Sequence, residues 1–486
     1  MNPSTDVIVI GAGPVGLLLA CELRLAGLDV VVLERRGAPV ADSRALSMHA
    51  RTVETLGLRG LAPRFVERGR PFGVGHYGAL ETMLDFSALD SSYPFQLVIP
   101  QSLTERLLEE HARALGVRLH RGATVDETWQ DDAGVHASGI SDRRRFTVSG
   151  AYLVGCDGAR SAVRRQAGIA FEGLDASTTT MLGDVRLRAP LQAPALMKVN
   201  QEGVLMIVPL GDGVHHRLIV LDARRRHVPV AEPVTLEELA DGARRIAGCD
   251  YLPSQPRWLS RFSDETRHAA QYRQGRIFLA GDAAHIHMPA GGQGMNVGMQ
   301  DAFNLGWKMA AVVRGQAPQA LLDSYNDERH PLGAHLFRNT MAQTALMTSL
   351  DERGLALRAE ISGLLTQPGA NLKLALQISG LGIGYGAALA EPPAPVLDGW
   401  SGRRIPDMPL ADGGSVHALL REGEWLYVRL RDDAPPAVTC PGRLRTVSAA
   451  LAPLSDASGA SQAELMAAGT RALLVRPDGY ADFALA

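Results

Sequence analysis

Gly11, Gly13 and Gly16 form a Gly-x-Gly-x-x-Gly turn near the N-terminus, and Glu34 stands 21 residues after Gly13. The turn follows a short apolar, β-branched run, which we expect to be a buried strand, and it precedes a stretch of helical composition. Gly11 would make the tight turn, Gly13 would let a pyrophosphate approach the backbone, and Gly16 would let the helix pack on the strand. The N–H groups at the start of the helix suit phosphates, and the Glu34 carboxylate suits ribose hydroxyls. The stretch therefore predicts a dinucleotide site.

Two later motifs carry acidic residues directly after apolar runs. Residues 152–164 contain Asp157, and residues 275–296 contain Asp282 followed by a glycine-rich loop. Asp282 is expected at the carboxyl end of a buried strand, where α/β folds place their ligands. It could also cap the helix that follows, and the two roles are compatible. The second motif therefore predicts a further contribution to a ligand site.

In order and spacing, these three motifs resemble the signatures of the FAD-dependent aromatic hydroxylases, the single-component flavoprotein monooxygenases. The resemblance runs from residue 5 to about residue 345 and includes residues 43–57 and 99–101. Within this family, the chain is most similar to hydroxylases of aromatic polyketides, including the tetracycline, angucycline and rifamycin-modifying types. Residues 472–480 resemble the ending of their C-terminal thioredoxin-like domain, which lacks the redox cysteines.

The resemblance implies a set of cofactor-binding residues when it is carried over position by position. Asp282 would accept hydrogen bonds from the ribityl hydroxyls, and Asp157 would help to hold FAD. Arg44 and Gln101 match contacts to the cofactor phosphates and the ribityl chain, although both residue types are also common in solvated loops. The backbone of Val125 matches the position that meets the adenine. The full expected set is Gly11, Gly13, Pro14, Val15, Gly16, Glu34, Arg35, Arg44, Gln101, Val125, Asp157, Gly281, Asp282, Pro289, Gly292, Gly294, Met295 and Asn296.

The glycine-rich loop after Asp282 suits a flavin in particular. Gly291, Gly292 and Gly294 would permit a tight backbone pass beside a flat ring. The helix that follows Gly294 would point its positive end at that ring. A reduced flavin carries negative charge at N1 and C2=O, and backbone N–H groups would stabilise that charge. The loop is therefore typical of a site for a flavin that becomes anionic.

The resemblance also implies the reaction. NADPH or NADH would donate a hydride to FAD. The reduced flavin would then capture O2 as a C4a-hydroperoxide, which transfers one oxygen atom to the phenolic ring of a polycyclic aromatic substrate. Because the cofactor supplies the difficult chemistry, we single out no catalytic acid or base in the protein. Three alternatives keep the same flavin site: Baeyer–Villiger insertion of oxygen beside a ketone, inactivation of a finished antibiotic, and FAD binding without turnover.

The composition disfavours several other classes of protein. Of the 486 residues, 46% are hydrophobic and 21% are charged, so the chain can bury a large core. The net charge of -3 gives no reason to expect nucleic acid or an anionic membrane as a partner. The four cysteines are far apart, which disfavours a zinc site, a disulfide scaffold and a disulfide reductase. Flavin-dependent halogenation is disfavoured because no Trp-x-Trp pair occurs in the sequence.

Neither a metal site nor a membrane span is expected. His285 and His287 would point to opposite sides of an extended segment, and no third ligand with suitable spacing follows them. The apolar runs are too short, or too broken by charge, to cross a bilayer. The N-terminus begins with a strand and not with an apolar signal segment, so we expect a cytoplasmic protein. The sequence leaves the oligomeric state open.

These motifs must be positioned by an α/β fold in three units. We expect a Rossmann-like FAD-binding domain, an inserted substrate-binding domain on a mixed or antiparallel sheet, and a thioredoxin-like C-terminal domain after a proline-rich linker. Long helices should close the FAD-binding domain, with a break at Pro331. The expected boundaries are residues 1–175 with 271–390 (including helices in 295–380), residues 176–270 and residues 396–486.

Overall fold

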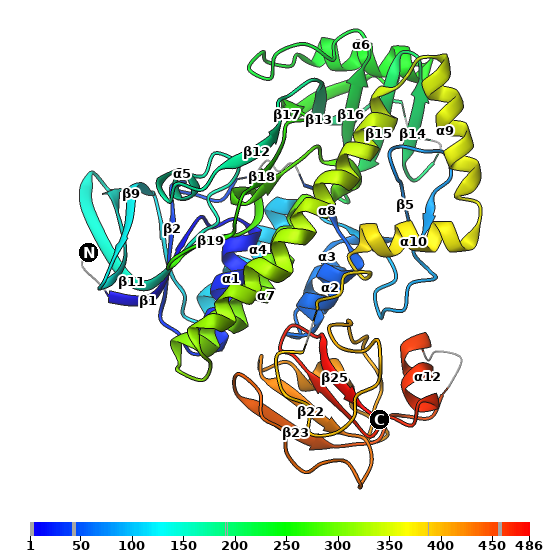
Figure 1. The fold of residues 1–486 in the computed structure, drawn as a ribbon. Coiled ribbons are helices and arrows are strands. Elements are labelled where there is room, and N and C mark those ends of the chain that lie inside the picture. The colour runs from blue at the N-terminus through cyan, green and yellow to red at the C-terminus, as the bar shows by residue number, and fades with distance from the viewer. Residues whose placement is uncertain (1–3, 41–44, 190, 192, 387, 455–458) are drawn as a thin grey trace.

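A sheet built mainly of parallel strands organises the first part of the chain (Figure 1). The computed structural model describes residues 4–486 except 41–44, 190, 192, 387 and 455–458. In this sheet β1 pairs in parallel with β2 and β11, and β11 pairs in parallel with β20, so the carboxyl ends of these four strands meet at one edge. In sheet order the strands are β19 (Arg273–Gln274), β20 (Ile277–Leu279), β11 (Arg144–Gly155), β1 (Ser4–Ile10), β2 (Val30–Glu34) and β8 (Arg118–Arg121), and β10 (Gly134–Ser141) joins β11 to β9 (Ala123–Asp131).

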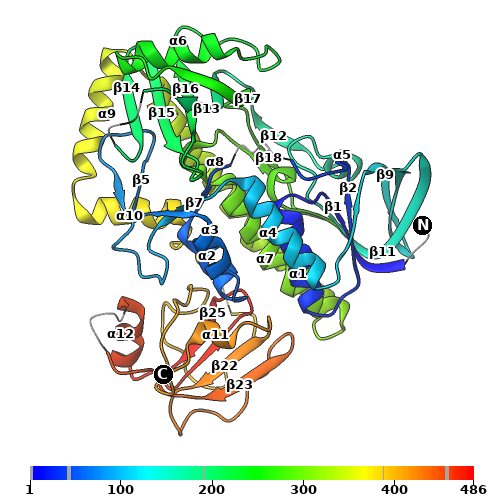
Figure 2. The ribbon, with the colours of Figure 1, turned by 180° about the vertical axis from the view of Figure 1, so that it is seen from behind.

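Helices α1 and α7 pack lengthwise against each other beside this sheet (Figure 2). α1 begins with Pro14, at a position where a backbone N–H would have no partner within the helix. α7 approaches α1 closely because Gly298 lies against Val15 and Gly306 lies against Glu22, where a Cβ would overlap the facing side chain. The helices of this part are α1 (Pro14–Leu25), α2 (Ala50–Gly57), α3 (Ala62–Arg68), α4 (Gln101–Ala114), α5 (Ala162–Gln166) and α7 (Gly294–Val313).

Short strands connect this part across long sequence distances. β3 pairs with β7, and β7 also pairs with β4, while β5 and β6 form a separate ribbon. This pairing brings the segment just before α2 next to the loop that precedes α4. The strands are β3 (Ser47–Met48), β4 (Arg70–Phe72), β5 (Val74–Gly75), β6 (Leu84–Asp85) and β7 (Gln96–Val98).

A second sheet, antiparallel throughout, occupies the middle of the chain. One of its faces packs on α6 (Leu236–Ala247), which begins at the capping residue Thr235 and ends at Gly248 in the left-handed conformation. A small three-stranded sheet is built from segments before and after the antiparallel sheet in the sequence, and its last strand follows β20 of the parallel sheet. In sheet order, the strands of the antiparallel sheet are β14 (Leu196–Asn200), β15 (Gly203–Pro209), β16 (His215–Asp222), β13 (Thr179–Leu187) and β17 (Pro253–Ser263). Those of the small sheet are β12 (Phe171–Leu174), β18 (Thr266–Ala269) and β21 (His285–Ile286).

The helix α8 (Asp323–Thr348) runs from α7 to the antiparallel sheet in both views (Figures 1 and 2). The prediction of a break at Pro331 is wrong, because α8 continues through this residue. Packing of α8 on α7 and on β18 holds the helix together across the missing N–H group. α9 (Glu352–Leu364) and α10 (Pro368–Ser379) follow and complete the helical part.

The C-terminal unit is a four-stranded sheet with two short helices. Numbered along the chain, its strands lie in the order 2-1-3-4, with the first two parallel and the others antiparallel. That is the strand arrangement expected for a thioredoxin-like domain, and its Cys440 is a free thiol. Among the described residues, no helix is both long and apolar enough to span a membrane. The elements are α11 (Val416–Leu419), β22 (Trp425–Arg429), β23 (Leu444–Ser448), α12 (Ala460–Ala467), β24 (Ala472–Val475) and β25 (Ala481–Leu485).

Candidate cofactor site

The glycine turn between β1 and α1 leaves space at one position only. Gly11 has a φ of +107°, and a Cβ there would overlap the carbonyl oxygen of Cys156. A Cβ on Gly16 would overlap the carbonyl oxygen of Gly11, so the fold itself requires both glycines. Among the described residues, apart from its neighbours in the chain, a Cβ on Gly13 would meet no atom within 4 Å. The space beside Gly13, at the start of α1, is therefore open for the phosphates of a dinucleotide.

The Glu34 carboxylate lies beside this turn, at the end of β2. Its two oxygens accept hydrogen bonds from the backbone N–H groups of Ala12, at 2.8 Å, and Arg36, at 2.9 Å. Gln101, the first residue of α4, donates to Glu105 at 2.7 Å. Burial, with a contribution from the charge of Glu34, raises the pKa of Glu105. Glu34 therefore fixes the glycine turn. The charge of Glu34 also raises the pKa of Glu105, which is the hydrogen-bond partner of the predicted residue Gln101.

Asp157 follows β11 at the same edge of the sheet. One carboxylate oxygen accepts from the N–H groups of Ala162, at 2.7 Å, and Val163, at 3.2 Å, at the start of α5. The other oxygen is buried and has no hydrogen-bond partner among the described residues. Asp157 thus holds the start of α5 and keeps one acceptor for a further donor.

Asp282 lies in a 3₁₀ turn, Gly281–Ala283, directly after β20, and it is exposed. The backbone N–H of Gly281 donates to the buried Asp301 at 3.1 Å, which fixes the start of the turn. Val15 of α1 packs on Gly281, so the two predicted segments meet here. The carboxyl ends of β1, β2, β11 and β20 therefore bring Gly13, Glu34, Asp157 and Asp282 to one edge.

The loop between Asp282 and α7 is clamped by side chains from a distant part of the sequence. Asn296 accepts from the N–H of His49 at 2.7 Å and donates to the carbonyls of Gly292, at 2.8 Å, and Ser47, at 3.1 Å. Gly292 has a φ of +65°, and a Cβ there would overlap the Ser47 hydroxyl. The predicted residue Asn296 thus uses its whole side-chain amide to hold the loop.

His49 holds the loop of the candidate site, and the sequence reasoning did not single it out. Its Nε2 contacts the carbonyl of Gly291 at 2.7 Å, and burial lowers the pKa of His49 to about 4. The ring is therefore neutral near pH 7, and its Nε2–H donates to the carbonyl. The only signal in the sequence was its place within residues 43–57, a stretch that resembles the family but gives no indication of its partner.

His287 presents an unused nitrogen to the start of α7. Its Nδ1 contacts the carbonyl of Met288 at 2.6 Å, and burial lowers its pKa to about 4. Its Nε2 is buried, has no hydrogen-bond partner in the described part of the chain, and would lie 3.2 Å from a Cβ on Gly294. His285 contacts a different group, because its Nε2 lies 2.8 Å from the carboxylate of Asp301.

The remaining predicted residues differ in their burial. Arg35 and Pro289 are exposed, Met295 is half-buried, and Val125 on β9 packs partly against the main core. Arg44 lies outside the described residues. The open space at Gly13, the buried free acceptors of Asp157 and His287, and two helix N-termini fit the phosphates, the hydroxyls and the flat ring of FAD.

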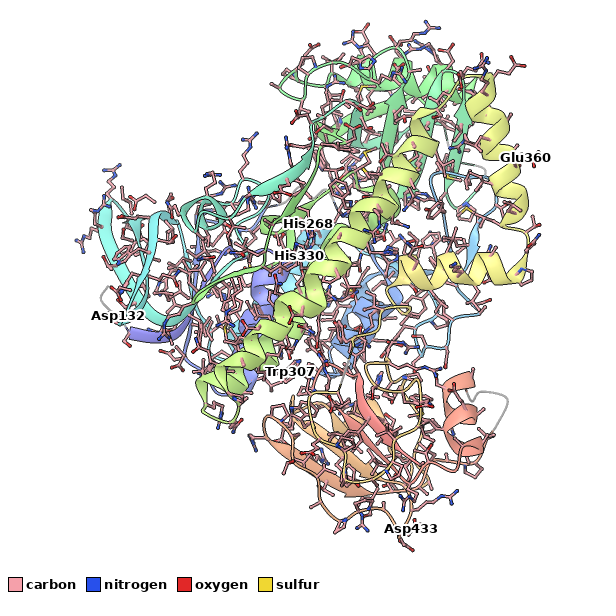
Figure 3. The ribbon with its side chains drawn as sticks, viewed as in Figure 1. Asp132, His268, Trp307, His330, Glu360 and Asp433 are labelled. Atoms are coloured by element: carbon pink, nitrogen blue, oxygen red, sulfur yellow. The ribbon has the colours of Figure 1, made fainter. Side chains whose placement is uncertain are left out.

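Replacing Asp282 by alanine should weaken FAD binding about 10- to 100-fold, because a charge-assisted hydrogen bond contributes ~1.5–3 kcal/mol. The matched control is Asp132→Ala, because Asp132 is an exposed residue in the turn of the β9–β10 hairpin, at the periphery of the molecule (Figure 3). Titration of each apoprotein with FAD, followed by quenching of flavin fluorescence, measures the effect. Equal affinities in the wild type and the Asp282 variant would remove Asp282 from the site.

Comparisons with known proteins agree with this geometry. Residues 4–340 match a family model described as FAD binding domain, and residues 398–486 match one described as aromatic-ring hydroxylase, C-terminal. An uncharacterized aromatic compound monooxygenase of Bacillus subtilis, YhjG, is 44% identical over 486 residues, which cover 99% of this chain and 94% of that protein. Rifampicin monooxygenase of Streptomyces venezuelae is 41% identical over 428 residues, covering 87% of each chain. The solved structure of OxyS, an anhydrotetracycline hydroxylase from Streptomyces rimosus, covers 100% of this chain and 96% of its own, with a TM-score of 0.86 and 39% identity.

Proposed function

Because the chain belongs to the family of FAD-binding aromatic-ring hydroxylases, we propose that it hydroxylates a polycyclic phenol of the aromatic polyketide class. The chain is an FAD-dependent monooxygenase, and NAD(P)H and O2 are the typical co-substrates of its family. When bound, FAD supplies the redox chemistry by accepting a hydride and activating O2. The protein's own residues bind and orient the cofactor and the substrate and keep water away.

The observation that carries the proposed substrate is an apolar cluster between the antiparallel sheet and the cofactor loop. Alternate residues of the sheet, including Met206 and Leu221, pack against Met288 and Ala290, which lie just before the glycine-rich loop, and against Met347 of α8. Three of these five side chains are methionines, which are unbranched and repack readily around a flat ligand. This cluster suits several fused rings, since ligand pockets are mostly apolar with a few orienting polar groups.

A buried ion pair supplies polar groups on the same face of the sheet. Arg217 donates to both carboxylate oxygens of Asp184, at 2.7 and 2.8 Å, and the indole N–H of Trp258 donates to the same carboxylate at 2.8 Å. Arg217 alternates along β16 with residues that face α6, so it shares a face with Leu221. Because Arg217 already has a carboxylate partner, it does not favour the carboxylate of a small benzoate.

The described residues would have different roles in binding FAD and in excluding water. The start of α1 would hold the pyrophosphate, and Glu34 keeps the turn there in place. The Asn296 and His49 clamp would orient the loop beside the flavin ring. The neutral ring of His49 adds no charge there, and the apolar cluster would exclude water from the reacting atoms.

We propose that each of the three units expected from the sequence has its own role. The parallel sheet with its helices, residues 1–175 and 271–390, would hold FAD, residues 176–270 would hold the substrate, and residues 396–486 would form the thioredoxin-like unit. A cytoplasmic location is part of the same proposal, and cell fractionation would test it.

The test of the proposed substrate is a competition between 4-hydroxybenzoate and a tetracyclic or angular phenolic polyketide. We expect the polycycle to be hydroxylated with tight coupling to NAD(P)H oxidation, while the benzoate is neither bound nor oxidised. Efficient hydroxylation of the benzoate, with no polycycle bound or turned over, would overturn the assignment.

A second candidate function is the oxidation of a finished antibiotic. The similarity to rifampicin monooxygenase, at 41% identity, favours it. Incubating the enzyme with NADPH and rifampicin, and assaying the residual antibacterial activity, separates the two candidates. A product in which oxygen has been inserted into a ring beside a ketone would instead identify Baeyer–Villiger chemistry.

A further inference from the structure

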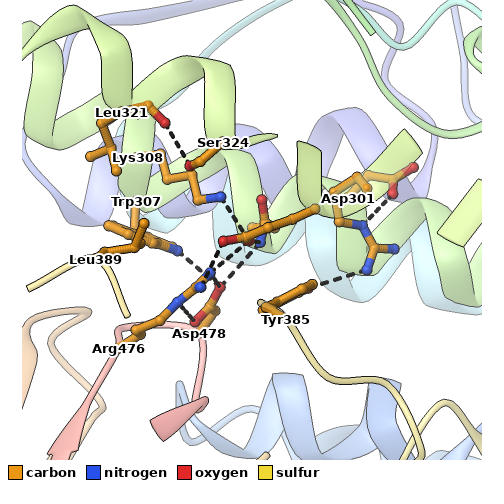
Figure 4. Close-up of polar contacts among 12 residues, drawn as sticks. Asp301, Trp307, Lys308, Leu321, Ser324, Tyr385, Leu389, Arg476 and Asp478 are labelled. Atoms are coloured by element: carbon orange, nitrogen blue, oxygen red, sulfur yellow. Dashed lines mark hydrogen bonds and ion pairs between the residues drawn. The ribbon is translucent and has the colours of Figure 1, made fainter. Parts of the chain in front are cut away.

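We infer that Arg329 and Tyr385 are positioning residues for the cofactor turn Gly281–Ala283, and that the C-terminal unit holds them in place. The inference rests on the FAD site of the family and not on the proposed substrate. Two groups of buried polar contacts lie next to each other here, one containing Asp301 and Tyr385 and the other containing Arg476 and Asp478 (Figure 4). The ring of Tyr385, against the guanidinium of Arg476, joins the two groups.

The first group begins at Asp301 on α7, which is completely buried. One of its oxygens accepts from the N–H of Gly281 at 3.1 Å and from His285 at 2.8 Å. Its other oxygen accepts from Nε of Arg329 at 2.8 Å. Burial raises the pKa of Asp301, but the charges of Arg329 and His285 outweigh it and hold the pKa below its usual value. Asp301 therefore stays ionised and fixes the turn only while Arg329 is in place.

Arg329 is held in turn by groups on two sides. It donates through Nη2 to the carbonyl of Val297 in the first turn of α7, at 3.1 Å, and through Nη1 to the hydroxyl of Tyr385, at 3.2 Å. The ring of Tyr385 lies 4.3 Å from the ring of Tyr480, and the guanidinium of Arg476 lies 4.7 Å from it. Tyr385 is thus the side chain through which the C-terminal unit reaches Arg329.

The neighbouring residue Glu328 ties α8 to the same corner. Both of its oxygens accept from Arg476, at 2.8 and 2.9 Å, and one also accepts from Lys308 at 2.7 Å. Asp478 pairs with Arg476 at 2.7 Å and accepts from the indole of Trp307 at 3.0 Å. Despite its burial, the charges of Arg476 and Lys308 lower the pKa of Glu328 to about 2.

This arrangement is a costly way to provide stability alone. Exposed ion pairs such as Arg403–Glu464 add little to stability, and buried pairs often cost more in desolvation than their attraction returns. Buried charged groups can, however, allow only one arrangement of the elements that carry them. Here the fixed arrangement includes α7, α8 and the turn that carries Asp282, which gives the C-terminal unit a direct role in shaping the cofactor site.

The test compares Tyr385→Phe with the matched control Tyr427→Phe. The first variant removes only the hydroxyl that binds Arg329. The second removes a hydroxyl of the C-terminal sheet that donates to the carbonyl of Pro435 at 2.9 Å and has no part in either group. We expect Tyr385→Phe to weaken FAD binding to the apoprotein about three- to tenfold, while Tyr427→Phe binds FAD as the wild type does. Tyr480→Leu, which removes the ring packed on Tyr385, should act in the same direction.

Thermal unfolding of the same apoproteins separates positioning from stability. If both tyrosine-to-phenylalanine variants lower the Tm equally and only Tyr385→Phe loses affinity for FAD, the positioning role is supported. Wild-type affinity for FAD in Tyr385→Phe and Tyr480→Leu would overturn it. Arg329→Met would leave Asp301 buried without its main partner and is expected to unfold the protein, so the tyrosine variants carry the test.

Discussion

Replacing Gly13 by alanine is expected to weaken FAD binding about 100-fold, or ~3 kcal/mol, while the apoprotein remains folded. A Cβ at this position meets no atom within 4 Å in the described part of the chain beyond its immediate neighbours, and the φ of -76° is one that alanine adopts freely. The apoprotein should even gain slightly in stability, because alanine restricts the unfolded chain. The added methyl group would instead occupy the space where the pyrophosphate approaches the backbone. Fluorescence titration with FAD and thermal unfolding of the apoprotein measure the two effects separately.

Gly16→Ala is the matched control for this experiment. Its Cβ would overlap the carbonyl oxygen of Gly11, so this variant should lose stability before any cofactor is added. Unchanged FAD affinity in Gly13→Ala would show that the phosphates do not lie against this turn.

Acidification from pH 6.5 to pH 4 should lower the free energy of unfolding by about 3 kcal/mol for each of His49 and His287. Burial lowers the pKa of both residues to about 4 in the folded protein, whereas an unfolded histidine titrates near pH ~6.5. Between these two values the unfolded chain binds more protons than the folded one. The contribution of these two neutral histidines to the free energy of unfolding is therefore complete above about pH 6.5 and is lost as the pH falls towards 4. Urea unfolding at a series of pH values measures the slope.

The variant that isolates this effect is His49→Gln, whose amide can still donate to the Gly291 carbonyl. It should unfold with a shallower dependence on pH than the wild type. His227→Gln, at an exposed histidine, should keep the wild-type slope. Equal slopes in all three proteins would mean that His49 does not carry the acid sensitivity.

Local patterns were enough to predict that the candidate site residues meet at one edge of the parallel sheet. The alternation of apolar strands, glycines and helical stretches placed Gly13, Glu34, Asp157 and Asp282 after four different strands. Parallel strands have their carboxyl ends on the same side of the sheet, so the fold class alone brings these residues together. The sequence also predicted a sheet in the middle of the chain but left it as mixed or antiparallel, and the structure makes it antiparallel throughout.

Partners far apart in the sequence could not be predicted in this way. Asn296 and His49 lie 247 positions apart, and Glu328 and Arg476 lie 148 positions apart. Each pair depends on how separate elements pack, and no local spacing encodes that packing. The expected break at Pro331 failed for the same reason, because contacts of α8 with α7 and β18 outweigh the local effect of proline.

The most direct test of the central claim is to incubate the purified enzyme, FAD, NADPH and a panel of polycyclic phenols under ¹⁸O₂, and to analyse the products by mass spectrometry. We predict a product that carries one labelled oxygen atom for each NADPH oxidised. Products whose new oxygen comes from water, or NADPH oxidation that yields only hydrogen peroxide with every phenol in the panel, would contradict the account.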